Sequence, residues 1–287
     1  MIIGKSTKVY QVLINMIAGL IACLTIYPFI YVLMSSISSP DMVAAGKVLL
    51  LPKEITFAAY QKVFEQKEIW IGYGNTIFYT AYGTMVNLFL TTCGAYALSR
   101  KELRGRTFFT IFIALTMWFK PGMIPQYLNY KELGLLDTRT LIVWGFGIDA
   151  FNVILLRSFF ESVPKSIDEA ARIDGASQFQ VLTKIYLPLS KAALATVGLF
   201  YAVSRWNGYF WAMITLRDSN KYPLQVVLKS FIAKMSDEVN GIDVVSELSQ
   251  QTFIYATIVV AVLPIVMIYP YIQKYFVKGV MIGSLKG

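Results

Sequence analysis

The chain has 287 residues, of which 56% are hydrophobic and 15% are charged, and its mean hydropathy is +0.56. Soluble domains carry about 25% charged residues, so this composition predicts a membrane protein. The sequence contains no histidine, which removes the commonest metal ligand and the usual general base near neutral pH. Hydrolytic enzymes and metalloproteins are therefore disfavoured.

The net charge of +9 does not by itself indicate nucleic-acid binding. Basic residues beside membrane spans are the ordinary result of topology and anionic lipid, and the sequence has no basic soluble module with interleaved aromatic residues. Cys23 and Cys93 both lie in apolar segments, where neither a disulfide framework nor a metal-binding pair has support. We therefore expect membrane lipid as a partner, with no nucleic acid and no bound metal.

Six stretches can cross a bilayer, which requires about 20 apolar residues of helix. The first is too long for the apolar core of a signal peptide and no cleavage site follows it, so we interpret it as a retained helix. The expected fold is all-α, a polytopic membrane protein with a single transmembrane domain over residues 1–287. The predicted spans are 9–36, 70–98, 107–126, 139–158, 188–213 and 252–272; Lys120, Asp149 and Arg205 interrupt the third, fourth and fifth.

Orientation follows from basic residues in short loops, which concentrate on the cytoplasmic side. Both termini are predicted to be cytoplasmic in a multi-pass protein of the cell membrane. Two longer segments, about 38–69 and 214–250, then lie outside, and their mixture of charged and aromatic residues predicts short surface helices. The basic residues are Arg100, Lys101, Arg104 and Arg106 between the second and third spans, and Lys274, Lys278 and Lys286 in the tail.

The most informative stretch is the loop between the fourth and fifth spans, residues 166–188. It contains two patterns in which a serine is followed three residues later by Glu or Gln, a capping box that starts a helix. Gly175 lies between them, where a chain reversal favours a residue tolerant of positive φ. The sequence thus predicts a rigid hairpin of two short helices. The capping pairs are Ser166 with Glu169 and Ser177 with Gln180.

The same loop resembles the EAA loop of ATP-binding-cassette (ABC) importer permeases, which have the type I, MetI-like fold. In that family the loop, here residues 159–188, docks in a cleft of a cytoplasmic ATPase subunit, so the resemblance implies a transport subunit that is not itself an ATPase. The alternative is an amphipathic hairpin that lies on the membrane without a partner. The residues matched to ATPase coupling are Glu169, Ala170, Ala171, Asp174, Gly175, Ile185, Leu187 and Pro188.

Nearly the whole chain is similar to the MalG-like carbohydrate permeases of bacteria, and within them to the branch that imports oligosaccharides from complex polysaccharides. Gly208 departs from the acidic residue that many relatives carry after a Trp-Asn pair. The resemblance implies a second permease subunit as a heterodimer partner, a dimer of ABC ATPase subunits, an extracytoplasmic binding protein and an oligosaccharide cargo. It also implies no cofactor on this chain, with ATP and Mg on the partner ATPase. Supporting stretches are residues 75–76, 95–100, 206–211 and 279–287.

Aromatic and amide side chains of the fifth span are candidates for the cargo pathway, because sugars stack on aromatic faces and bond to planar polar groups. The span begins at the hairpin, so one continuous helix is expected to link the two. An aromatic belt at the membrane interface is the alternative. The candidates are Trp206, Asn207, Tyr209 and Trp211, with Asn207 and Trp211 on one helical face.

The three charged residues inside spans allow two readings. Lys120 and Arg205 suit an acidic sugar such as a uronate, or Asp149 pairs with one of them to lower the cost of burial, which is the reading we favour. Rival functions are a permease for a non-sugar solute and, less well supported, an ion-coupled secondary transporter. A membrane enzyme lacks any nucleophilic or paired-carboxylate group of residues.

Overall fold

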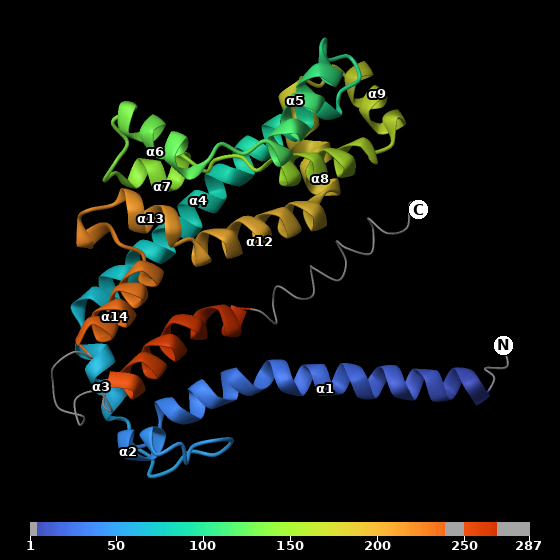
Figure 1. Cartoon of the computed structure of the whole chain (residues 1–287). Coiled ribbons are helices and arrows are strands. Elements are labelled where there is room, and N and C mark those ends of the chain that lie inside the picture. The colour runs from blue at the N-terminus through green and yellow to red at the C-terminus, as the bar shows by residue number, and fades with distance from the viewer. Residues whose placement is uncertain (1–4, 239–249, 269–287) are drawn as a thin grey trace. The chain divides into compact units, whose positions relative to one another are not determined.

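The computed structural model describes residues 5–238 and 250–268, and within these ranges it is helical with no strand (Figure 1). The all-α fold class is confirmed. The chain divides into two compact units, one of Met1–Ile69 with Leu228–Pro264 and the other of Trp70–Val227 with Ile265–Gly287. A single domain over residues 1–287 stays a prediction. The basic tail residues and the stretch 279–287 lie outside the described residues.

The first unit contains the first predicted span and the surface helices that follow it. Within α1 (Lys5–Ser36), residues Tyr10–Ser36 are long and apolar enough to cross a membrane. The short helices α2 (Pro40–Ala44) and α3 (Ala58–Glu65) form the next segment, as predicted. The Ser36 and Tyr60 hydroxyls lie 2.8 Å apart and tie the end of α1 to α3.

A second helix of this kind, Gln250–Ile268, lies mainly in the first unit and covers most of the last predicted span. The ring of Tyr255 meets that of Tyr31 edge-on at 5.9 Å, which packs this helix against α1. Over the described residues, length and hydropathy identify two spanning helices, or up to four if each of two bent helix pairs is one span. The count of six spans therefore stays a prediction.

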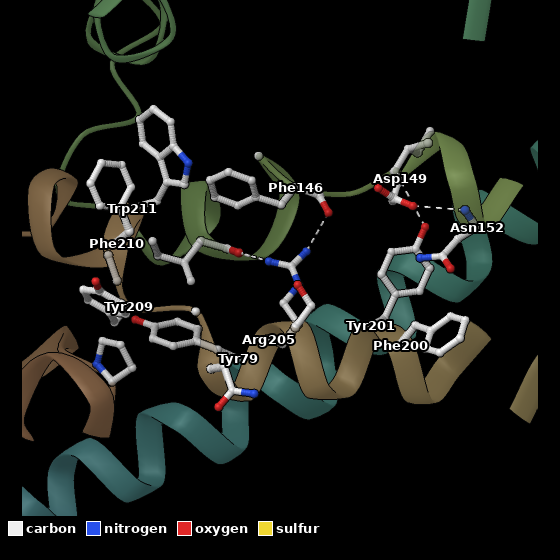
Figure 2. Close-up of a pocket in the computed structure, with 18 of the residues that line it drawn as sticks. Tyr79, Phe146, Asp149, Asn152, Phe200, Tyr201, Arg205, Tyr209, Phe210 and Trp211 are labelled. Atoms are coloured by element: carbon white, nitrogen blue, oxygen red, sulfur yellow. Dashed lines mark hydrogen bonds between the residues drawn. The ribbon is translucent and has the colours of Figure 1, made fainter. Parts of the chain in front are cut away.

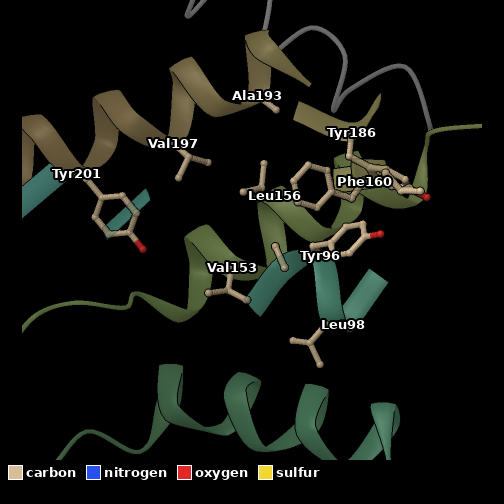
Figure 3. Packing of buried hydrophobic residues seen from close by; sticks show 11 residues of the cluster. Tyr96, Leu98, Val153, Leu156, Phe160, Tyr186, Ala193, Val197 and Tyr201 are labelled. Atoms are coloured by element: carbon tan, nitrogen blue, oxygen red, sulfur yellow. The ribbon is translucent and has the colours of Figure 1, made fainter. Parts of the chain in front are cut away.

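The second unit is organised around α4 (Lys67–Ser99), α8 (Ala150–Glu161) and α12 (Lys191–Asn207). α8 packs against α12 and against α5 (Arg106–Trp118). Figure 3 shows the shared apolar core, in which side chains from all three helices interlock. Its fully or nearly fully buried members include Ala95 and Leu98 of α4, Val153, Leu156 and Phe160 of α8, and Ala193 and Val197 of α12.

Three predicted spans are not continuous helices, which corrects the prediction from sequence. The third is α5 followed, after a bend of 116°, by α6 (Met123–Glu132). The fourth is α7 (Arg139–Trp144) followed by α8, and the fifth is α12 followed by α13 (Phe210–Thr215). Glycine and proline end helices, and irregular backbone at membrane depth occurs where it is buried in protein or lines a cavity. The residues at the breaks are Pro121 and Gly122, Gly145 and Gly147, and Gly208.

The expected continuous helix from the loop into the fifth span is also wrong. The chain passes from a π-helical turn (Leu182–Tyr186) into α11 (Leu187–Leu189) and then bends by 84° before α12. Ser190, at φ −103° and ψ 18°, occupies the bend and is not helical. Movement of the loop therefore has no straight helical route to α13.

The N-terminal half of α4 forms hydrogen bonds to the segment that connects α13 to α14 (Leu224–Glu238). The Asn75 amide donates to the carbonyls of Asn220 and Tyr222 at 2.8 and 3.0 Å, and the Leu224 N–H donates to the Thr76 hydroxyl at 2.8 Å. Beside them, backbone N–H groups at residues 217 and 218 hold the pKa of Asp137 below its usual value. These bonds attach the segment before α14 to α4 and to Asp137, which lies just before α7.

Candidate functional site

Two short helices form the hairpin that the loop sequence predicts. α9 (Lys165–Ile173) is joined to α10 (Gln178–Val181) through a turn at Gly175, whose φ is +79°. The capping box at Ser177 is present: its hydroxyl accepts from the Gln180 N–H at 3.3 Å, and the Gln180 side chain accepts from the Ser177 N–H at 2.8 Å. The glycine turn and the second helix start therefore have the structures that were predicted.

The first capping box is absent. α9 starts at Lys165 behind Pro164, with no side-chain cap, so Ser166 already lies within the first turn. The fixed φ of proline suits the start of a helix, and it sets this start two residues earlier than the serine would. The prediction at Ser166 and Glu169 is corrected accordingly.

The residues matched to ATPase coupling divide between the hairpin surface and the core beneath it. Ala171, Ile185 and Leu187 are half-buried and pack against the core of Figure 3. Two exposed apolar residues, missed from sequence, lie on the same hairpin: Ile173 is 86% exposed and Phe179 is 73% exposed. The exposed matched residues are Glu169, Ala170, Asp174, Gly175 and Pro188.

A cavity of about 820 Å³ lies in the second unit, at the breaks between α7 and α8 and between α12 and α13 (Figure 2). Aromatic side chains form much of its wall, and amides, hydroxyls and two charged groups supply hydrogen-bonding atoms. Asn207, Tyr209 and Trp211 line it, as does Arg205. The ring of Trp211 is held edge-on to Tyr130 at 5.6 Å.

Trp206 does not line this cavity. Its side chain is buried, with 8% exposed, and its Nε1 has no hydrogen-bond partner within the described ranges. The expectation that Asn207 and Trp211 share one helical face is wrong, because α12 ends at Asn207 and α13 starts at Phe210. Gly208, at φ −71° and ψ 96°, turns the chain between them. The break, and not helical periodicity, brings Asn207 and Trp211 to the same cavity.

Arg205 is held by four hydrogen bonds to neutral groups. Its Nε donates to the Asn87 amide oxygen at 2.9 Å, and its Nη atoms donate to the carbonyls of Ile142, Val143 and Phe146. These bonds use four of the five N–H groups of a guanidinium. Arg205 thus ties α12 to α4 through Asn87, and to the end of α7 and the break after it through the three carbonyls. Figure 2 shows its bond to the carbonyl of Phe146.

The favoured pairing of Asp149 with Lys120 or Arg205 is wrong. The Asp149 carboxylate instead caps α8, accepting from the Asn152 N–H at 3.0 Å, and its own N–H donates to the Tyr201 hydroxyl at 3.0 Å. Lys120 is exposed at the break after α5. A carboxylate at a helix N-terminus satisfies orphan backbone donors and needs no cation.

The position of Arg205 depends on Gly83 of α4. A Cβ at Gly83 would lie 3.0 Å from Arg205 Nε and 3.2 Å from its Cζ, and the four hydrogen bonds leave the guanidinium little freedom to move. We expect Gly83→Ala to destabilise the purified protein by about 1–3 kcal/mol, the usual cost of overpacking.

Gly94→Ala on the same helix is the matched control, because nothing lies within 4 Å of its added Cβ. Alanine is favoured over glycine in helices by about 1 kcal/mol, so this control keeps or gains stability. Thermal unfolding in detergent measures both variants. Equal melting temperatures for the two would contradict the close contact.

Several cavity residues were missed from sequence because nothing local distinguishes them. Asn152, Phe200 and Tyr201 line the wall, and the Asn152 amide oxygen is buried without a partner in the described structure. Asn152 lies in the first turn of α8, three residues after the capping Asp149, a placement that only the break before α8 reveals. The two ring residues were indistinguishable from ordinary core aromatics.

Comparisons with known proteins agree with this architecture. The chain is 38% identical to the polygalacturonan/rhamnogalacturonan transport system permease protein YtcP of Bacillus subtilis (strain 168), over 98% of this chain and 99% of that protein. It is 39% identical to protein LplC of the same organism, over 99% and 97% of the two chains.

Among solved structures, one chain of a bacterial ABC transporter involved in the import of the acidic polysaccharide alginate is 44% identical. It superposes with a TM-score of 0.88 over 96% of this chain and 99% of that chain. Residues 103–282 match the model of the binding-protein-dependent transport system inner membrane component. This match covers more than half of the sequence and includes the hairpin, the cavity wall of α7, α8, α12 and α13, and both breaks. The chain therefore belongs to the family of binding-protein-dependent transport system inner membrane components, the permease subunits of ABC importers.

Proposed function

We propose that this permease passes oligosaccharides inward through the cavity at the breaks of its spans. The cavity is the observation that carries the proposal. It combines ring faces, such as those of Tyr209, Phe210 and Trp211, with polar groups, such as those of Asn152 and Asn207. Ligand sites in transporters form at discontinuous helices near the middle of the membrane, and stacking with directed hydrogen bonds suits sugar rings.

The relatives support a sugar cargo of this kind. One is named for polygalacturonan and rhamnogalacturonan transport, and the solved neighbour takes part in alginate import. A second protein, 24% identical over 98% of this chain, is an arabinooligosaccharide transport system permease of Bacillus subtilis. Acidic and neutral saccharides are both represented among these names. The experiment below therefore compares oligosaccharides with and without charge.

The exposed hairpin residues fit a role in docking a separate ATPase subunit. Glu169 and Asp174 supply negative charge, and Ile173 and Phe179 supply apolar surface with no cover in the described structure. Apolar anchors surrounded by polar residues are typical of binding hot spots. In this proposal a dimer of such ATPase subunits holds ATP and Mg, and the present chain binds no cofactor.

The remaining partners in the proposal are a second permease chain and an extracytoplasmic binding protein. The exposed face of α5 carries large apolar side chains, including Phe108, Phe112 and Leu115, which suit lipid or a second permease. The protein is a multi-pass component of the bacterial cell membrane, with both termini cytoplasmic. One chain of a solved bacterial alginate ABC transporter, crystallised in complex with an alginate pentasaccharide-bound periplasmic protein, shares the fold at 17% identity and a TM-score of 0.57.

ATP-driven uptake in reconstituted vesicles tests the proposal. The chain is co-expressed with a second permease, an ATPase and a binding protein, and uptake of neutral and uronate-containing oligosaccharides is measured with ATP or with a non-hydrolysable analogue inside the vesicles. We expect accumulation of at least one oligosaccharide class with ATP alone. Uptake driven by an ion gradient, or ATP-dependent uptake of amino acids or peptides instead, would contradict the proposal.

A further inference from the structure

One end of α4 grips both helices of the hairpin. The guanidinium of Arg100, at this end, donates to both oxygens of Asp168 on α9, at 2.8 and 2.7 Å. One turn earlier, the Tyr96 hydroxyl lies 2.9 Å from the side-chain oxygen of Gln178 on α10 and donates to it. α9 and α10 are therefore both attached to the last turn of α4 and the residue that follows it.

The contact between Arg100 and Asp168 is enclosed. Asp168 is only 8% exposed, and Arg100 also donates to the Tyr186 hydroxyl at 2.9 Å. The Arg100 guanidinium carbon lies 5.4 Å from the ring centre of Tyr96 and 5.6 Å from that of Tyr186. Arg172 of α9 adds a second cation 3.3 Å from Asp168. A bidentate ion pair between aromatic rings has one defined geometry. A displacement of α9 is therefore passed to α4 and is not absorbed by rearrangement of the pair.

The same helix reaches the cavity wall. α4 runs without a break over 33 residues (Figure 1). About two and a half turns before Tyr96, Asn87 binds Arg205, which in turn binds the carbonyls of Val143, near the end of α7, and of Phe146, in the break that follows. By contrast, the direct route along the chain from the hairpin to the cavity contains the π-helical turn and the 84° bend at Ser190.

We propose that α4 is the lever that carries movement of the hairpin to the cavity, and that Arg100 and Asp168 are the positioning residues that attach it. The inference rests on the proposed function, in which an ATPase moves the hairpin. The Arg100–Asp168 pair couples the hairpin to α4, and the Asn87–Arg205 contact couples α4 to the cavity wall. The Arg100–Asp168 pair touches neither cargo nor nucleotide in this mechanism.

A thiol placed in the cavity wall detects whether movement of the hairpin changes the accessibility of the cavity. Ser204 lines the cavity and is exposed, so Ser204→Cys is a near-isosteric probe, made in a chain whose exposed Cys23 and Cys93 are replaced by alanine. Complexes are isolated through a tag on the ATPase, so that every sample contains docked hairpin. The labelling rate with a small maleimide is then compared between ADP and ATP plus vanadate.

The test variants are Asp168→Asn, which keeps the size but removes the charge, and Arg100→Lys, which keeps the charge but removes the bidentate contact. Lys101→Gln is the matched control, an exposed neighbouring cation with no ion pair in the described structure. Tyr96→Phe removes one hydroxyl and is the variant least disturbing to the fold. We expect the nucleotide-dependent change in labelling to persist in the Lys101→Gln control, to shrink in Tyr96→Phe and Arg100→Lys, and to be lost in Asp168→Asn.

The outcomes separate the inference from the proposed function. A full nucleotide-dependent change in both Asp168→Asn and Tyr96→Phe complexes would overturn the lever, while the proposed function stands. A parent chain that does not bind the ATPase at all would overturn the proposed function and the inference with it. If Asp168→Asn chains do not assemble, Tyr96→Phe decides: an undiminished change refutes the lever.

Discussion

A Glu169→Lys chain is expected to insert into the membrane at normal abundance and to lose cargo uptake. Glu169 is exposed on α9, and its carboxylate pairs with no cation among the side chains that the structure describes. Its replacement therefore leaves the hairpin intact but places a positive charge on the proposed docking surface. Like charges across an interface cost several kcal/mol, and each 1.4 kcal/mol weakens binding about tenfold. A cost of about 3 kcal/mol corresponds to roughly hundredfold weaker binding, so we expect the association with the ATPase to weaken by at least this factor.

Gly175→Ala tests the geometry of the same hairpin without changing charge. A side chain has room here, because nothing lies within 4 Å of the added Cβ, but φ is +79° and the backbone would be strained. Gly134→Ala is the matched control: it has φ +66°, open space and a position at the end of α6, away from the hairpin. Both variants carry a strain of about 1–2 kcal/mol. Only Gly175→Ala should reduce uptake and cargo-stimulated ATP hydrolysis.

Uptake into vesicles and co-purification of the ATPase measure these effects, with membrane abundance as the reference. Normal association and uptake in Glu169→Lys would refute the docking role of α9. Equal losses in Gly175→Ala and Gly134→Ala would show that general backbone strain, and not hairpin geometry, limits transport.

The hairpin could be predicted from sequence because its signals are local. A capping box and a glycine in the left-handed region act within three or four residues, so Ser177, Gln180 and Gly175 have the expected structures. The error at Ser166 is also local, since Pro164 competes for the same helix start. The exposed apolar residues Ile173 and Phe179 were missed because an isolated apolar side chain in such a segment was expected to be buried.

The cavity could not be predicted because it depends on contacts between distant parts of the chain. Arg205 bonds to Asn87, 118 residues earlier, and to the carbonyl of Phe146, 59 residues earlier. Hydropathy averaged over a span also hides a break, so segments containing Gly145, Gly147 or Gly208 were read as continuous helices. Asp149 was expected to pair with a cation because its helix-capping role becomes visible only once the break before α8 is known.

The aromatic residues either contact cargo in the cavity or form a belt at the membrane interface. The order in which different oligosaccharides are preferred for uptake distinguishes these two interpretations. Trp211→Ala is expected to weaken uptake of some oligosaccharides far more than of others. Trp211 lines the cavity, and its ring is already fixed by Tyr130 and Phe146, with centroids 5.6 and 6.0 Å away, so it offers a pre-ordered stacking face. Stacking of a base on an aromatic ring is worth about 1–3 kcal/mol, and a sugar ring stacked in the same way would lose roughly fivefold to more than a hundredfold in affinity.

Asn207→Ala should change the ranking in a different way, because a lost hydrogen bond affects only cargoes that present a hydroxyl at that position. The Asn207 amide is exposed and, among the described residues, donates to the Val203 carbonyl alone, at 3.0 Å, which leaves its oxygen for a ligand. Trp206→Ala is the matched control on the same turn: this ring is buried outside the cavity, so its loss should lower membrane abundance and reduce uptake of every cargo equally.

Uptake of a panel of neutral and uronate oligosaccharides, each normalised to abundance and basal ATP hydrolysis, measures all three variants. If Trp211→Ala and Asn207→Ala reduced all cargoes in proportion, as Trp206→Ala should, these side chains would be anchoring the fold or the membrane interface, and the cargo would have to pass elsewhere. A changed ranking in the first two alone places the cargo against the break between α12 and α13, because Asn207 and Trp211 line the cavity there and Trp206 does not.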